Sequence, residues 1–345
     1  MNELEAAKAK QFWEGTEGRW KTSKWEHWLQ HPKVKERINA LVSGDPRKDC
    51  FQYFIERYFR GRLGRRRRVK RALTLGCGYG EFERGLSQYK FARIHEALDI
   101  SIDAIAEASK LANAGGFEHI WYRVGDLNRI ELSKCIYDVV FGISSIHHVS
   151  DLKHLFLQVA LSLKPGGYFF LDEYIGPSKF QWTDDQLAII NEQIAMLPPD
   201  LRLPINGSVL KGAVWRMTLQ EMDAADPSEA IHSADILQLL PQFFNIVEVK
   251  GYGGSLLHVL LEGIAGNFVE DDPRSMAYLR SFFEVEDQLI ASGRLQHDFA
   301  VIVARRKPTR VQKVLGCKIA YLVSKTRAVL RETRRVRTQV SAVLF

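Results

Sequence analysis

A short glycine-rich turn between an apolar strand and a helix constrains the fold of this chain more than any other feature. The run Ala72-Leu73-Thr74-Leu75 leads directly into Gly76-Cys77-Gly78-Tyr79-Gly80, and residues 81–86 continue with helical spacing. Such a turn brings backbone N–H groups close to a ligand at the carboxyl end of the strand. Glu81 occupies the position of the last glycine in a dinucleotide-binding turn, and an acid there repels a pyrophosphate. The turn therefore favours a ligand without phosphates.

The unit of strand followed by helix recurs along the chain. We expect strands at 72–75, 97–100, 120–124, 137–143 and 168–171, helices at 101–113 and 151–163, and two late strands at 245–251 and 298–305. Short strands that are apolar on both faces and alternate with helices are typical of a parallel sheet with right-handed crossovers. The sequence therefore predicts a doubly wound α/β fold.

Three parts follow from this pattern. Residues 1–70 have helix-like aromatic spacing and form an N-terminal helical region that packs on the sheet or closes over it as a lid. Residues 71–307 form the α/β domain, with an insertion at about 176–240 and helices expected at 184–196, 255–265 and 275–290. Residues 308–345 carry nine Lys or Arg and one Glu, a net of +8, so the other 307 residues carry about −1 of the total of +7.

The basic segment 308–345 also has apolar residues at helical spacing, which predicts a basic amphipathic helix. Three partners stay open for it: the domain itself, a partner protein, and an anionic membrane surface. No run of about 18 apolar residues would span a bilayer, and the first ten residues have no apolar signal core. We expect a cytoplasmic protein, with peripheral contact at the inner membrane surface as an open alternative.

Two acids follow the next two strands of the predicted sheet. Asp99 ends the second strand, where a carboxylate can accept hydrogen bonds from both hydroxyls of a ribose. Asp126 ends the third strand, where a carboxylate can bind an adenine amine while Leu127 lies on the ring. The carboxyl ends of neighbouring parallel strands share one edge, so these acids and the glycine turn are expected to meet there.

In order and spacing, residues 73–80, 98–101, 125–127, 137–149 and 163–167 resemble the motifs of class I S-adenosylmethionine-dependent methyltransferases. The resemblance implies a seven-stranded sheet with the last strand antiparallel, and S-adenosylmethionine as cofactor with S-adenosylhomocysteine as product. It also implies a cofactor-binding set: Gly76, Cys77, Gly78 and Gly80 at the amino-acid end, Asp99 and Ile100 at the ribose, Asp126 and Leu127 at the adenine, and Ile143 and Ser144 beneath the methionine part.

The residues after the fourth and fifth strands are the candidates for chemistry. His147 and His148 lie where the activated methyl group should be, and either is a candidate base for a hydroxyl acceptor, with His147 preferred. Glu173 and Tyr174 share that edge and are candidates to orient an acceptor. Because Ser144 is followed by a second serine and no acid follows the fourth strand, we predict no metal.

Methyl transfer from a sulfonium is an in-line displacement that depends mainly on positioning the acceptor. We expect metal-independent transfer to a hydroxyl or amine of a small molecule or glycan. A nucleic-acid or lipid methyltransferase that uses the basic clusters is the alternative, although residues 143–146 lack the Asn/Asp-Pro-Pro-aromatic pattern of base-amine methylation. An alternative outside the enzymes is an interaction protein that binds S-adenosylmethionine without catalysing a reaction.

Overall fold

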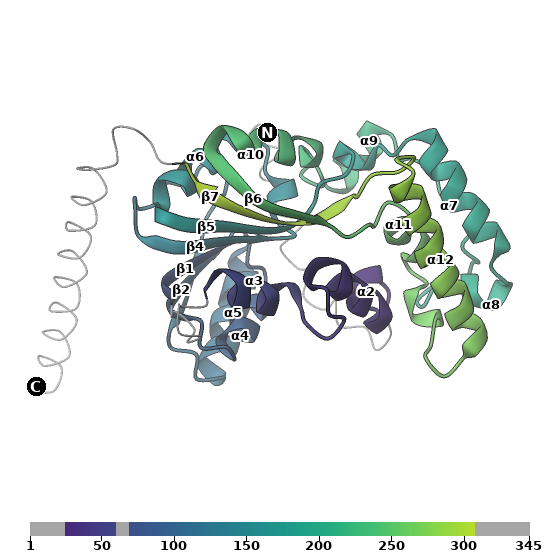
Figure 1. The fold of residues 1–345 in the computed structure, drawn as a ribbon, viewed down its shortest axis with the longest axis horizontal. Coiled ribbons are helices and arrows are strands. Elements are labelled where there is room, and N and C mark those ends of the chain that lie inside the picture. Colours follow the sequence, from purple (N-terminus) through teal and green to yellow (C-terminus); the bar gives the residue numbers. More distant parts are fainter. Residues whose placement is uncertain (1–24, 60–68, 308–345) are drawn as a thin grey trace, which may run out of the picture.

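A seven-stranded sheet organises the part of the chain that the computed structural model describes, residues 25–59 and 69–307 (Figure 1). The strands are β1 (Val69–Leu75), β2 (Ala92–Asp99), β3 (Ile120–Val124), β4 (Tyr137–Ile143), β5 (Leu163–Tyr174), β6 (Phe244–Gly251) and β7 (Phe299–Arg306). Their order across the sheet is β3-β2-β1-β4-β5-β7-β6. The order reverses between β1 and β4, which is where ligands bind in sheets of this kind.

The strand directions agree with the predicted topology. Strands β1 to β5 pair in parallel, whereas β7 runs antiparallel to both β5 and β6. The doubly wound, mostly parallel α/β sheet with an antiparallel last strand is therefore confirmed. The carboxyl ends of β1, β2, β4 and β5 lie along one edge, as the parallel pairing requires.

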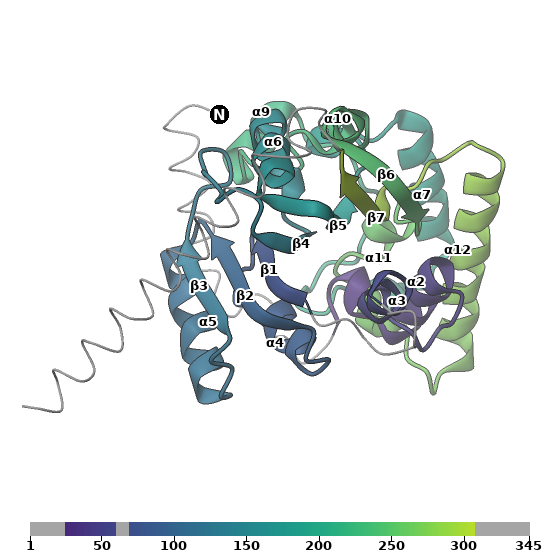
Figure 2. The ribbon, with the colours of Figure 1, turned by 60° about the vertical axis from the view of Figure 1, so that its left-hand side comes forward.

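Helices cover both faces of the sheet, as Figure 2 shows. On one face lie α4 (Glu81–Ser87) and α5 (Ile102–Ala114), with the N-terminal helices α2 (Pro32–Ser43) and α3 (Cys50–Tyr58) beside them. On the other face α6 (Leu152–Ser162) packs against α10 (Ile236–Phe243). Apolar side chains of the central strands are buried on both faces, which explains why these strands are continuous apolar runs in the sequence.

The segment after β5 adds a further layer beside the sheet. It contains α7 (Asp184–Met196), α8 (Pro199–Arg202) and α9 (Leu219–Ala225), and after β6 come α11 (Leu257–Leu261) and α12 (Pro273–Ala291). Single turns of 3-10 helix lie at Trp28–Gln30, Ile146–His148, Ser178–Phe180, Ser233–Asp235 and Ala265–Asn267. Between α8 and α9, residues 203–218 contain no helix or strand.

Several of the predicted elements differ in extent; for example, β1 and β2 begin at Val69 and Ala92 rather than at positions 72 and 97. The helix expected at 255–265 is only the short α11, and Gly263 at φ +75° takes the backbone out of the helical region just after its end. The strand expected at 168–171 is longer at both ends, since Leu163 already pairs with Tyr137 in β4. The predicted basic helix at 308–345 lies outside the described residues. So do the aromatic residues at 12–20 of the predicted N-terminal helical region.

None of the helices in the described residues is both long enough and apolar enough to cross a lipid bilayer.

Candidate functional site

The glycine turn after β1 adopts a conformation that only glycine tolerates well. Gly76, Gly78 and Gly80 have φ of +66°, +49° and +74°. Space is also restricted: a Cβ on Gly76 would lie 2.5 Å from the Cβ of Ser145, and one on Gly80 would lie 2.3 Å from the Tyr122 hydroxyl. The turn is therefore fixed in shape by both backbone and packing, with Gly80 capping α4.

Asp99 at the end of β2 is bonded directly to this turn. Its Oδ2 accepts from Gly78 N at 2.8 Å and its Oδ1 accepts from Ser101 N at 2.9 Å, while Cys77 N donates to Leu98 O at 2.9 Å. Burial raises the pKa of Asp99, and the backbone donors oppose this shift. Asp99 and its neighbour Ile100 thus lie beside the glycine turn, where the resemblance places the ribose of the cofactor.

Asp126 and Leu127 lie next along the same edge. Gly125 N donates to Asp99 O at 2.8 Å, which brings the end of β3 against the end of β2. Asp126 Oδ1 accepts from Asn128 N at 2.9 Å and shapes its own turn, and Leu127 packs against the core on one side.

Ile143 and Ser144 complete the cofactor edge at the end of β4. Ser144 is exposed, has φ +46° and donates its N–H to Asp172 O at 2.8 Å. A serine in this region of φ is strained. The residue after it, Ser145, is buried and donates its hydroxyl to Leu75 O at 2.7 Å, which ties this segment to the glycine turn.

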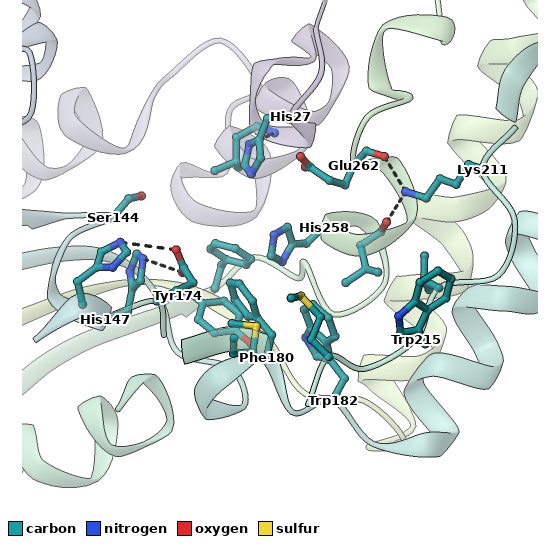
Figure 3. A pocket seen from close by; sticks show the side chains of 18 residues that line it. His27, Ser144, His147, Tyr174, Phe180, Trp182, Lys211, Trp215, His258 and Glu262 are labelled. Carbon is teal, nitrogen blue, oxygen red and sulfur yellow. Dashed lines mark hydrogen bonds and ion pairs between the residues drawn. The ribbon is translucent and has the colours of Figure 1, made fainter. Parts of the chain in front are cut away.

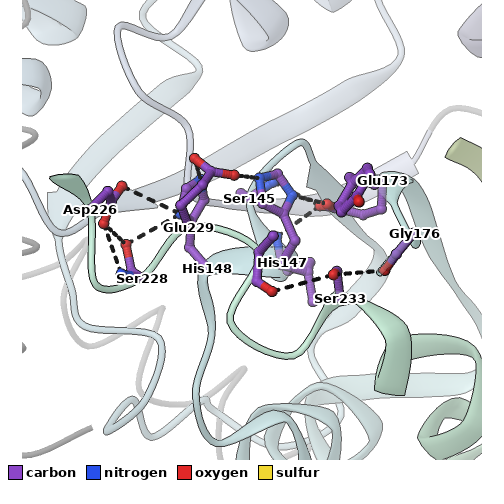
Figure 4. A network of polar contacts seen from close by, with 12 residues as sticks. Ser145, His147, His148, Glu173, Gly176, Asp226, Ser228, Glu229 and Ser233 are labelled. Carbon is purple, nitrogen blue, oxygen red and sulfur yellow. Dashed lines mark hydrogen bonds and ion pairs between the residues drawn. The ribbon is translucent and has the colours of Figure 1, made fainter. Parts of the chain in front are cut away.

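His147 and Glu173 form a buried pair directly beyond Ser144 (Figure 4). His147 Nδ1 lies 2.7 Å from Glu173 Oε2, and the other oxygen of Glu173 accepts from the N–H groups of Ser145 and Ile146, each at 2.8 Å. Glu173 is 0% exposed. A carboxylate with two N–H donors is well stabilised as the anion, so it can hold the proton of His147 on Nδ1 and leave Nε2 to face outward.

His148 and Glu229 extend this pair into a cluster. His148 Nδ1 lies 3.2 Å from Ser228 Oγ, and Glu229 approaches both histidines, 3.6 Å from His147 Nε2 and 3.9 Å from His148 Nε2. One ligand atom from each of His147, His148 and Glu229 falls within 4.8 Å of the others, a spacing that could hold a metal ion. Glu229 comes from the segment between α9 and α10.

The environment separates the pKa values of the two histidines. Burial lowers the pKa of His147, but its hydrogen bond to Glu173 and the charge of that carboxylate outweigh burial and raise it overall. Burial lowers the pKa of His148, and the neighbouring His147 lowers it further. Two titratable groups with opposite shifts in one pocket are typical of an acid and base site.

A pocket of about 660 Å³ opens from this cluster (Figure 3). Ser144, His147 and Tyr174 lie at one end, and Lys211 and Trp215 at the other. Aromatic and apolar side chains line most of the wall between them: Phe180, Trp182, Val214, Met217, Met222, Val259 and Phe299. Its size is within the range of small-molecule sites, and its lining suits an acceptor with an apolar body.

Tyr174 is part of the pocket wall. Its hydroxyl donates to Pro177 O at 3.1 Å, its ring lies edge-on to Phe180, and burial raises the pKa of its hydroxyl. A phenol held this way presents its ring to the pocket. The structure therefore brings all four candidate catalytic residues to one place, with Glu173 behind His147.

Several pocket residues were not among the candidates from the sequence. Glu229, Lys211 and Trp182 come from the insertion, and His258 comes from α11. No motif spacing relates these residues to the sheet edge. The one signal in the sequence was the enrichment of methionine: three of the chain's five methionines, Met196, Met217 and Met222, lie in the insertion.

Part of the chain is similar to known methyltransferases. Residues 73–171 match the family model described as a methyltransferase domain. Fatty-acid O-methyltransferase of Mycolicibacterium smegmatis is 29% identical over 143 residues, 41% of this chain and 49% of that protein. Sterol 24-C-methyltransferase of Aspergillus fumigatus is 26% identical over 121 residues, 35% of this chain and 32% of that protein.

The chain thus spans about half of the first relative's length and about a third of the second's. Among solved structures, geranyl diphosphate methyltransferase in complex with GPP and sinefungin has a TM-score of 0.46 at 14% identity, covering 78% of this chain and 83% of that one.

Proposed function

We propose that this chain transfers the methyl group of S-adenosylmethionine to a small molecule with an apolar body. The match of residues 73–171 to the methyltransferase domain family supports the methyl transfer. The acceptor lies in the 660 Å³ pocket, and a hydroxyl or amine at its end points towards Ser144 and His147. Ser144 belongs both to the cofactor edge and to the lining of the pocket, and the proposal is based on this observation.

His147 is the proposed general base for a hydroxyl acceptor. Its Nδ1 proton is held by Glu173 at 2.7 Å, so Nε2 carries the lone pair that takes the acceptor proton as the C–O bond forms. The methyl group leaves the sulfonium, which becomes the neutral thioether of S-adenosylhomocysteine. Glu173 is a positioning residue, because it acts through His147, and no step requires a metal.

The lining of the pocket favours an apolar acceptor over a glycan. A glycan needs many hydrogen-bonding partners, whereas the charged side chains here lie towards the two ends of the pocket. The wall between them is mainly aromatic and apolar, with His27 and His258 as its polar side chains. Two relatives are named for a fatty acid and a sterol, which supports the same preference. A lipid-like molecule therefore replaces the glycan as the preferred acceptor.

Formation of S-adenosylhomocysteine tests this function across a panel of acceptors. The panel pairs long-chain alcohols, amines and hydroxy acids with glycans of equal hydroxyl content. We expect turnover with the apolar members and a fall of about 100-fold or more in His147→Ala for hydroxyl acceptors. Turnover with glycans alone would reject the apolar assignment, and binding of S-adenosylmethionine without any turnover would favour a non-catalytic role.

A further inference from the structure

Lys211 lies at the end of the pocket away from the histidine cluster, and its ammonium group is held in place by backbone. Its Nζ donates to Val259 O at 2.7 Å and to Glu262 O at 2.6 Å. The backbone N–H of Lys211 donates to Arg202 O at 2.8 Å, which fixes the position from which the side chain extends. In Figure 3 the side chain extends towards His258 and Glu262.

The hydrogen bonds of the Lys211 ammonium group go to neutral backbone carbonyls. Among the residues that the structure describes, its hydrogen-bond partners are the two carbonyls, and it forms no ion pair with a carboxylate. Burial lowers its pKa to about 8, so the amine is still mostly protonated at neutral pH. An ammonium group has three N–H donors, and two are used. Lys211 is half-buried, and a half-buried cation with a remaining donor gains from an anionic partner.

The surroundings of Lys211 leave room for such a partner. Glu262 lines the same wall, and the charge of its carboxylate raises the pKa of Lys211. Burial raises the pKa of Glu262 itself to about 7, so this acid is only partly ionised at neutral pH. Val214 and Trp215 lie beside Lys211 on the irregular segment 203–218, and Asn191 holds Val214 through hydrogen bonds of 2.7 and 3.0 Å. The wall that carries Lys211 is therefore anchored by contacts that do not involve the lysine's ammonium group.

We propose that Lys211 binds an anionic head group of the acceptor, such as a carboxylate, while the atom to be methylated lies at the opposite end of the pocket beside His147. The acceptor is then an amphipathic acid: an anionic group, an apolar body against Phe180 and Trp182, and a nucleophilic hydroxyl or amine. This assignment rests on the proposed function and specifies its substrate class.

Binding of simple probes tests the assignment without turnover. Trp182 and Trp215 line the pocket, so quenching of tryptophan fluorescence should report occupancy. We would titrate dodecanoate, 1-dodecanol and dodecyltrimethylammonium, below their micellar concentrations, into the full chain saturated with S-adenosylhomocysteine. We expect dodecanoate to bind about 10-fold to 100-fold more tightly than 1-dodecanol, with the cationic probe weakest.

Two substitutions separate charge from structure. Lys211→Gln keeps an amide that can donate to the carbonyls of Val259 and Glu262 but removes the charge, and Lys211→Arg keeps the charge. We expect Lys211→Gln to bind dodecanoate only as well as 1-dodecanol, and Lys211→Arg to retain the preference for the acid. Equal binding of both probes to the unaltered chain, no binding of dodecanoate, or equal weakening of both in Lys211→Gln would overturn the proposal.

Turnover with 12-hydroxydodecanoate and 1-dodecanol distinguishes this inference from the function it deepens. Lys211→Gln should raise KM for 12-hydroxydodecanoate about 10-fold or more without changing its kcat. The KM and kcat for 1-dodecanol should stay the same. If neither acceptor is methylated while dodecanoate binding still depends on Lys211, methyl transfer to these acceptors fails and the anion site stands. If both are methylated with no effect of Lys211→Gln, the function stands and the anion site fails.

Discussion

His147 Nδ1 lies 2.7 Å from Glu173 Oε2, and Glu173 is fixed in turn by the N–H groups of Ser145 and Ile146 at its other oxygen. This geometry determines which nitrogen of the imidazole can accept a proton. With a carboxylate behind Nδ1, the neutral ring carries its proton on Nδ1 and its lone pair on Nε2.

Glu173→Gln should therefore reduce the ability of His147 to accept a proton by more than the loss of the Glu173 charge alone would. The amide oxygen of the glutamine would accept from Ser145 and Ile146, which turns its NH2 group towards Nδ1 and places the ring proton on Nε2. We expect kcat to fall about 100-fold or more for hydroxyl acceptors, with little change in the Kd of S-adenosylmethionine.

The pH profile provides the second readout for the same variant. The unaltered chain should gain kcat/KM as pH rises through the pKa of His147, which Glu173 holds above its ordinary value of 6.5. In Glu173→Gln this midpoint should move to lower pH, because burial then lowers the pKa without the opposing carboxylate. An unchanged midpoint with a lower plateau would show that Glu173 does not control His147.

The sequence predicted the part of this site that belongs to the sheet. Gly76, Asp99, His147 and Glu173 each lie at or just after the carboxyl end of a parallel strand, so their common edge follows from the topology alone. What could not be predicted is which side chains pair: nothing in the spacing of His147 and Glu173 indicates that the carboxylate lies behind the ring.

The pocket beyond this edge was not predictable, because it is built by tertiary contacts. Glu229 reaches the histidines through Ile231 N, which donates to His147 O at 3.1 Å, and this contact has no periodic signature in the sequence. The position of Lys211 in the pocket also has no periodic signature in the sequence, because Lys211 lies on the irregular segment 203–218. The prediction of no metal was based only on the lack of an acid directly after the fourth strand, and Glu229 reaches the histidines from another segment.

Alanine at Gly76 should abolish tight cofactor binding while the sheet remains folded. The new Cβ would meet Ser145 at 2.5 Å, and an alanine at φ +66° costs about 1–2 kcal/mol in the backbone alone. We expect the Kd for S-adenosylhomocysteine, measured by calorimetry, to rise at least about 10-fold. Gly85→Ala is the matched control, since Gly85 is helical and its Cβ meets nothing within 4 Å; equal loss in both variants would contradict the role of the turn.

Divalent zinc should inhibit the proposed reaction rather than support it. His147, His148 and Glu229 can place three ligand atoms around one ion, and an ion on His147 Nε2 would occupy the lone pair that the base needs. We expect EDTA to leave turnover unchanged, and added Zn²⁺ to inhibit it in a manner that EDTA reverses. Loss of turnover in EDTA with recovery on adding a divalent ion would instead show a metal-dependent enzyme.

Glu83 should make the stability of the free protein fall between mildly acidic and neutral pH. Burial raises the pKa of this carboxyl in the first turn of α4 from 4.5 to about 7, although Thr74 partly opposes the shift. The folded state therefore binds the proton more tightly than the unfolded state. The stabilisation is complete below pH 4.5 and is lost as pH rises to about 7, by about 3 kcal/mol at most.

Glu83→Gln removes this titration and should flatten the dependence. We expect the Tm of Glu83→Gln minus that of the unaltered chain to increase from pH 5 to pH 7.5 and to stay constant above that. The exposed Glu81 in the same turn offers a control, because Glu81→Gln removes a charge without removing a buried carboxyl. If Glu83→Gln and Glu81→Gln give parallel curves of Tm against pH, Glu83 is not the group that titrates.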